Sequence, residues 1–116
     1  MKNILLICLL SISFLGFAKK PNTRYFEMRI YYCHPGRLDA LLQRFTNHTT
    51  KIFEKHGMTN VGYWIPNNNT ENALYYILSY PSQADRDTSW SHFGKDPEWK
   101  ADEGEVEMRL VKDAIS

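Results

Sequence analysis

The chain has 116 residues, of which 43% are hydrophobic and 14% are aromatic. This composition is sufficient for one packed domain and argues against a disordered chain. The 14 Lys and Arg residues almost balance the 13 Asp and Glu residues, so the formal net charge is only +1. A chain with so small a net charge lacks the excess of basic residues that binds nucleic acid or an anionic membrane, and we expect neither partner.

Residues 1–18 have the pattern of a secretory signal peptide. Lys2 provides a positively charged start, residues 4–17 are almost all apolar, and Gly16-Phe17-Ala18 resembles a small-x-small cleavage site. The apolar stretch is shorter than the roughly 20 residues that span a bilayer, so we expect no stable membrane span once the signal is removed. We therefore predict a mature domain of residues 19–116 that is periplasmic or secreted. The alternative is an uncleaved membrane anchor.

The first predicted elements are a strand and a long helix. Apolar and polar side chains alternate along residues 24–33, RYFEMRIYYC, which favours a strand. His34-Pro35-Gly36 ends this strand, since proline cannot donate to a sheet. Apolar residues at helical spacing then predict a helix from residue 37 to about 56, with Gly57 at its C-terminal cap.

The remaining pattern predicts a hairpin, a second helix and a last strand. Strands at 58–65 and 73–80 flank the turn sequence PNNNT, and the second of them, ALYYILSY, is apolar on both faces. We expect this strand to be buried on both sides. Ser82 is placed to cap the second helix, a helical turn is expected at 96–99, and a strand at 106–111.

The order βαββαβ is that of the ferredoxin-like fold, an α+β arrangement with a four-stranded antiparallel sheet. Three segments also resemble the NIPSNAP family: PGRLD at 35–39, EKHGMTNVGYW at 54–64, and the segment from Tyr80 to Trp99 with its ADRDTSW and DPEW motifs. The resemblance implies a dimeric α/β barrel. In such a barrel, each sheet carries helices on one face and meets the sheet of its partner with the other.

We expect the open face of the sheet to carry Tyr31, Tyr76, Leu78 and Tyr80. A face this apolar needs a partner, which predicts a homodimer that Tyr76→Asp would disrupt. Many family members have His and Trp where Tyr76 and Leu78 stand here. Chemistry that depends on that His is therefore not carried over to this chain.

The sequence identifies no catalytic residue and leaves enzyme activity open. The histidines at 34, 48, 56 and 92 lack ligand spacing, since His48 and His56 are about 12 Å apart along one helix. We therefore predict no metal site. A GxSxG nucleophile motif and a glycine-rich phosphate loop are both missing from the sequence, and we predict no cofactor. After signal removal Cys33 is the single cysteine, which excludes a disulfide within the domain.

The candidate ligand-binding residues share one predicted cavity between two sheets, and they are Glu27, Arg29, Tyr31, Tyr63 and Tyr76. Arg29 is suited to bind an anionic or carbonyl group, Glu27 to hold Arg29, and the tyrosines to form apolar walls with polar tips. The competing interpretation is an ion pair that seals a dimer interface. Two further hypotheses are a cofactor-independent monooxygenase or isomerase, by analogy with other dimeric α/β barrels, and a non-catalytic scaffold for a protein partner.

Overall fold

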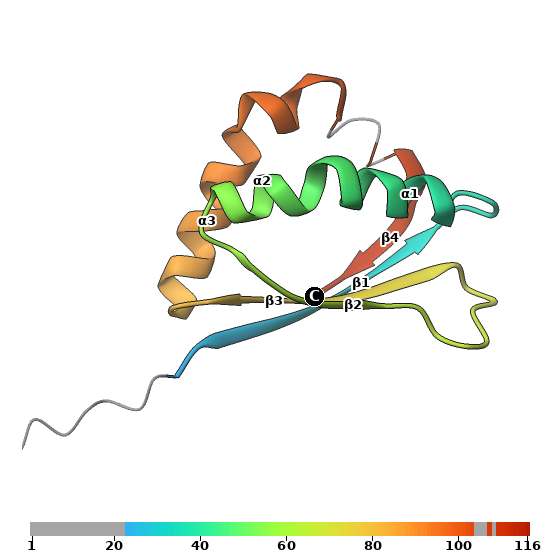
Figure 1. Ribbon diagram of the computed structural model, residues 1–116, viewed down its shortest axis with the longest axis horizontal. Coiled ribbons are helices and arrows are strands. Elements are labelled where there is room, and N and C mark those ends of the chain that lie inside the picture. Colours follow the sequence, from blue (N-terminus) through green and yellow to red (C-terminus); the bar gives the residue numbers. More distant parts are fainter. Residues whose placement is uncertain (1–22, 104–106, 108) are drawn as a thin grey trace, which may run out of the picture.

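The computed structural model describes residues 23–103, 107 and 109–116. Four strands form one sheet in the order β2-β3-β1-β4, and every pair of neighbours is antiparallel. The strands are β1 (Tyr25–Cys33), β2 (Thr59–Trp64), β3 (Ala73–Tyr80) and β4 (Val111–Ile115). All helices of the described residues lie on one face of this sheet, and none of them covers the other face (Figure 1). The predicted α+β, ferredoxin-like architecture is confirmed.

The predicted helix at 37–56 is present, with a π-helical turn in its middle. It consists of α1 (Leu38–Arg44), η1 (Phe45–Thr49) and α2 (Thr50–Lys55), and the backbone keeps helical angles at both junctions. Gly57 ends the helix with φ +77°, a conformation that glycine adopts without strain. The predicted cap is therefore confirmed.

The second helix is α3 (Gln83–Lys95), and its start is as predicted. The hydroxyl of Ser82 accepts a hydrogen bond from the backbone N–H of Asp85 at 3.1 Å, which is a standard N-cap. A further helical turn follows Asp96 and leads into η2 (Trp99–Glu103), where the helical turn at 96–99 was expected. None of the helices in the described part of the chain is long and apolar enough to cross a membrane.

The two faces of the sheet are the reverse of our expectation. Tyr31, Tyr76, Leu78 and Tyr80 are all buried beneath the helices. The uncovered face instead carries Phe26 and Met28 of β1, which are 58% and 50% exposed. Because β3 is apolar on both faces, its sequence offers no polarity that would orient it. The orientation is decided by contact with aromatic rings of the helices, such as the T-shaped contact between Phe45 and Tyr76 at 5.3 Å.

The predicted burial of both faces of β3 holds only in part. On the uncovered face Ala73 and Ser79 are buried, whereas Tyr75 and Ile77 are partly exposed. Ser79 is covered by Arg24, whose Nε donates to its hydroxyl at 3.0 Å. The middle of this face is therefore available for contact with another surface.

The last strand begins later than predicted. Residues 107, 109 and 110 are helical, so the prediction of a strand at 106–111 is wrong there, and 106 and 108 lie outside the described residues. The carboxyl group of Glu107 is fully buried and accepts a hydrogen bond from the Thr49 hydroxyl. This contact with the helix layer competes with strand pairing, which starts at Val111 opposite Cys33.

The predicted signal peptide, residues 1–18, lies outside the described residues.

An aromatic core fills the space between sheet and helices and positions the polar groups at its edge. Phe53 of α2 stacks on Tyr76 at 6.1 Å and contacts Phe93 of α3 at 5.2 Å. The same core holds the ring of Tyr31 against Tyr76 at 5.3 Å. Polar tips on these rings are consequently fixed by packing of their apolar bodies.

Candidate functional site

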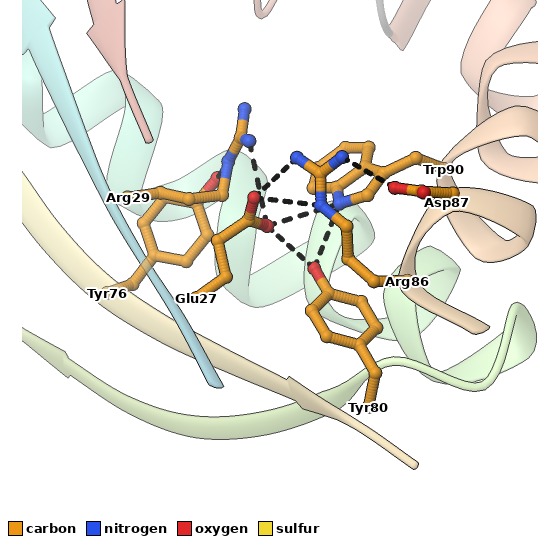
Figure 2. A network of polar contacts seen from close by, with 7 residues as sticks. All are labelled: Glu27, Arg29, Tyr76, Tyr80, Arg86, Asp87 and Trp90. Carbon is orange, nitrogen blue, oxygen red and sulfur yellow. Dashed lines mark hydrogen bonds and ion pairs between the residues drawn. The ribbon is translucent and has the colours of Figure 1, made fainter. Parts of the chain in front are cut away.

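The most connected polar group between the sheet and α3 is the carboxylate of Glu27 (Figure 2). Arg86 of α3 donates from Nε at 3.0 Å and from Nη2 to one carboxylate oxygen. Tyr80 of β3 donates its hydroxyl to the other oxygen at 2.8 Å, and the indole N–H of Trp90 approaches it at 3.2 Å. Groups from β1, β3 and α3 thus meet at one carboxylate.

The surroundings of Glu27 keep it ionised. Burial alone would raise the pKa of its carboxyl group, but the hydrogen bonds from Arg86 and Tyr80 and the charges of Arg29 and Arg86 outweigh burial. The net effect is a pKa below the ordinary value of 4.5. Glu27 is therefore an anion at neutral pH, held by two arginines.

Arg29 lies beside Glu27 and is held by aromatic side chains. Its Nε donates to the hydroxyl of Tyr76 at 2.9 Å, and Nη1 lies 3.8 Å from Glu27. The guanidinium carbon lies 4.4 Å from the ring centre of Trp90 and 5.7 Å from that of Tyr31, which is cation–π geometry. The side chain is 15% exposed. The terminal nitrogens carry four more N–H donors, which gives this site the capacity to bind an oxygen of a ligand.

The buried tyrosines next to Arg29 remain protonated at neutral pH. Burial raises the pKa of Tyr76 and of Tyr63 well above 10. Their rings stack at 5.3 Å, and the hydroxyl of Tyr63 donates to Asn60. They are suited to act as hydrogen-bond donors and apolar walls, and their raised pKa argues against a role as a base.

All five predicted ligand-binding residues lie on the helix-covered face of the sheet. The structure brings Glu27, Arg29, Tyr31 and Tyr76 together, and Tyr63 joins them through its stack on Tyr76. The predicted position between two sheets is therefore wrong for these residues. Whether they bind a ligand stays a prediction.

Sequence reasoning missed the partners that α3 and β3 contribute, namely Arg86, Trp90 and Tyr80. Arg86 and Trp90 are four residues apart on one helix, and such residues share a face. This spacing, combined with the Ser82 cap that predicts the helix, indicates that Arg86 and Trp90 lie on the same face of α3. The sequence favours a core role for Trp90 instead, because aromatic residues at near-helical spacing are more often core than site.

Among the described residues, surface pockets also lie away from this network. One of about 400 Å³ contains Cys33, whose thiol has its pKa raised by burial to about 11 and is thus a weak nucleophile. Another of about 300 Å³ lies beside α1 and η1. Within the described residues, no three or more His, Cys, Asp or Glu side chains are grouped so that they could hold a metal ion.

Comparison with known proteins shows where this architecture recurs. The NIPSNAP family model matches residues 26–114. An uncharacterized NIPSNAP domain protein from Burkholderia xenovorans is 18% identical, with TM-score 0.70 and coverage of 80% of this chain and 88% of that one. A NIPSNAP family protein of unknown function from Agrobacterium tumefaciens is 22% identical, with TM-score 0.72 and coverage of 83% and 86%.

A more distant structure is described as a dimeric ferredoxin-like protein from an uncultured marine organism. It is 12% identical, with TM-score 0.62, and the match covers 84% of this chain and 87% of that one. Such likenesses show the fold alone. No curated protein matches the chain.

Proposed function

Because the chain belongs to the NIPSNAP family, we propose that it is a homodimeric binding protein that joins through its uncovered sheet face. A small molecule with a carbonyl or anionic group binds at Arg29, between the sheet and the helices of each protomer. The observation that carries the ligand proposal is an arginine held by Tyr76, Glu27 and two aromatic rings, with part of its side chain open to solvent.

The dimer proposal is supported by large apolar side chains on the uncovered face. Phe26 and Met28 on β1, Trp64 on β2 and Ile115 on β4 are between 41% and 58% exposed. Strand pairing places all four on the face opposite the buried Tyr31 and Tyr76, because Ile115 pairs with Ile30 and Trp64 pairs with Tyr75. No helix of the described residues covers that face of the sheet (Figure 1). An apolar surface of this kind marks an interaction site, and a second copy presents the same surface in return.

The dimer is tested by multi-angle light scattering on wild type, Met28→Asp and Thr88→Asp. Thr88 is an exposed residue of α3, so its variant adds the same charge away from the sheet. We expect wild type and Thr88→Asp to be dimers and Met28→Asp to be a monomer, since a lone carboxylate between two apolar sheets is costly. A monomeric wild type would contradict the proposal.

The ligand is tested by native mass spectrometry of the protein purified without additives, followed by a thermal-shift screen of small carbonyl compounds and carboxylic acids. Compounds that bind at Arg29 should lose their effect in Arg29→Lys, which keeps the charge but not the planar donor set. Arg37→Lys is the matched control, because Arg37 is exposed and its side chain makes no cap hydrogen bond. A protein that binds none of these compounds would favour the scaffold hypothesis instead.

Export is a separate part of the proposal and rests on the sequence of residues 1–18 alone. We expect the mature protein in the periplasm or the medium, beginning near Lys19. The intact mass of the protein recovered from each cell fraction tests this. A cytoplasmic protein that retains residues 1–18 would overturn it.

A further inference from the structure

The pocket of about 400 Å³ lies at the end of the sheet where β1 stops, away from the surroundings of Arg29. Three segments that are far apart in the chain meet there: the end of β1, the turn before β3 and the first residues of β4. The backbone N–H of Cys33 donates to the carbonyl of Asn72 at 3.0 Å, and Tyr32 pairs with Asp113. The walls of the pocket are therefore held by the sheet, and its volume is that of a small-molecule site.

A β-bulge decides which charged groups line this pocket. Tyr32 pairs with Asp113, whereas the next residue of β1, Cys33, pairs with Val111. Lys112 is therefore an extra residue of β4 without a partner on β1. Neighbours on a regular strand point to opposite faces, yet Lys112 and Asp113 both line the pocket. The bulge thus brings an ammonium group and a carboxylate to one place, and bulges are frequent next to active sites for this reason.

The charged groups that line this pocket are exposed and are not paired with one another. They are Glu71, Lys112 and Asp113. Among the residues that the structure describes, no ion pair joins Lys112 to either carboxylate. One oxygen of Asp113 accepts a hydrogen bond from the backbone N–H of Ala114 at 2.9 Å, which orients this carboxylate. An ammonium group and two carboxylates are therefore available to a ligand at the same place.

We propose that this pocket is a second binding site, for an α-amino acid with an apolar side chain. The carboxylate of the ligand pairs with Lys112, and its ammonium group pairs with Glu71 and Asp113. Its side chain contacts Pro35 and the ring of Tyr32, which line the same pocket. Opposite charges that share a pocket without pairing with each other are complementary to a ligand that carries both charges. The site does not rest on the function proposed above.

The test is isothermal titration calorimetry with L-phenylalanine and with two analogues that each lack one of its charges, 3-phenylpropionate and 2-phenylethylamine. We expect saturable binding of phenylalanine and about fivefold weaker binding of each analogue, the usual effect of one ion pair at an exposed position. No saturable binding of phenylalanine would overturn the proposal. Equal affinity for either analogue would overturn the assignment to an amino acid. Titrations of Arg29→Lys separate the two sites, since loss of phenylalanine binding in this variant would place the ligand at Arg29 instead.

Two variants assign the two ends of the ligand. Lys112→Gln should weaken binding of phenylalanine about fivefold without weakening that of 2-phenylethylamine, which has no carboxylate. Glu71→Gln should weaken binding of phenylalanine without weakening that of 3-phenylpropionate, which has no ammonium group. Lys51→Gln is the matched control, because Lys51 is an exposed residue of α2 that does not line the pocket. Binding of phenylalanine to Lys112→Gln as tight as to Lys51→Gln would contradict the proposed site.

Cys33 provides a readout in the unmutated protein that does not depend on the folding of a variant. It lines the pocket and is 3% exposed, so its reaction with iodoacetamide requires access through the pocket. We expect the rate of alkylation, followed by mass spectrometry of the peptide that contains Cys33, to fall as phenylalanine saturates the protein. A rate that is unchanged at saturation would show that phenylalanine binds elsewhere.

Discussion

Glu27 and Glu107 are both removed from water, yet their pKa values shift in opposite directions. Glu27 accepts hydrogen bonds from Arg86 and Tyr80, which lower its pKa despite burial. Glu107 accepts from Thr49 and has an unpaired oxygen, so burial dominates and raises its pKa to about 7. The first carboxyl is therefore a structural anion, and the second exchanges a proton near neutral pH.

Glu27→Gln should destabilise the fold, because it leaves two arginines without their shared carboxylate. Arg86 is 28% exposed, so we expect about 2 kcal/mol, less than for a fully buried pair. Asp87→Asn is the matched control, since Asp87 is an exposed partner of the same Arg86 and should change stability by less than about 0.5 kcal/mol. Urea unfolding measures both, and equal losses would mean that Glu27 does not organise the network.

Glu107 should make stability fall as pH rises from about 4.5 to about 7. In this window the folded state binds more protons than the unfolded state, because the folded pKa is raised from 4.5 to about 7. The contribution lost by pH 8 is up to about 3 kcal/mol. Free energies of unfolding at pH 5 and pH 8, for wild type and Glu107→Gln, isolate the pH-dependent contribution of the Glu107 carboxyl. The variant should lack it, and an identical pH dependence in both proteins would refute the assignment.

At the scale of elements, α3 carries Arg86 and Trp90 to the carboxylate of Glu27, so its first turn matters for the site. Ser82 is the N-cap of this helix, since its hydroxyl accepts a hydrogen bond from the backbone N–H of Asp85. In the first helix, the π-helical turn η1 is the local feature next to the contact with Glu107. It comes directly after Arg44 and ends at Thr49, the partner of Glu107.

Ser82→Ala should cost about 1 kcal/mol, the usual value of a lost N-cap, and lower the thermal midpoint by several degrees. Ser91→Ala is the control, because Ser91 is exposed in the interior of the same helix, where alanine is favoured. Circular dichroism during heating measures both variants. A loss of stability in Ser91→Ala as large as that in Ser82→Ala would show that the cap has no special role.

At the scale of the whole molecule, the sheet has one face under the helices and one apolar face uncovered. A protein that buries this face in a dimer is stabilised by mass action. Its thermal midpoint should therefore rise by a few degrees when the protein concentration increases 100-fold, whereas that of Met28→Asp should stay constant. Scanning calorimetry at two concentrations checks this. A midpoint of the wild type that is independent of concentration would contradict the dimer.

Local patterns determined much of this protein. The alternation along β1, the helical spacing before Gly57 and the cap at Ser82 each predict their element, because these signals depend on neighbours in the chain. The five predicted site residues also prove to share one face of the sheet: Glu27, Arg29 and Tyr31 alternate along β1, and Tyr76 pairs directly with both Arg29 and Tyr63.

Only the tertiary structure decided which face the helices cover. β3 is apolar on both sides, so either orientation would bury similar surface, and packing against Phe45 and Phe53 makes the choice. The start of β4 was decided in the same way, by the contact of Glu107 with Thr49, 58 residues away in the chain. Interactions between distant residues leave no periodic signal in a sequence, and for this reason the surroundings of Arg29 and of Glu107 emerged only from the folded chain.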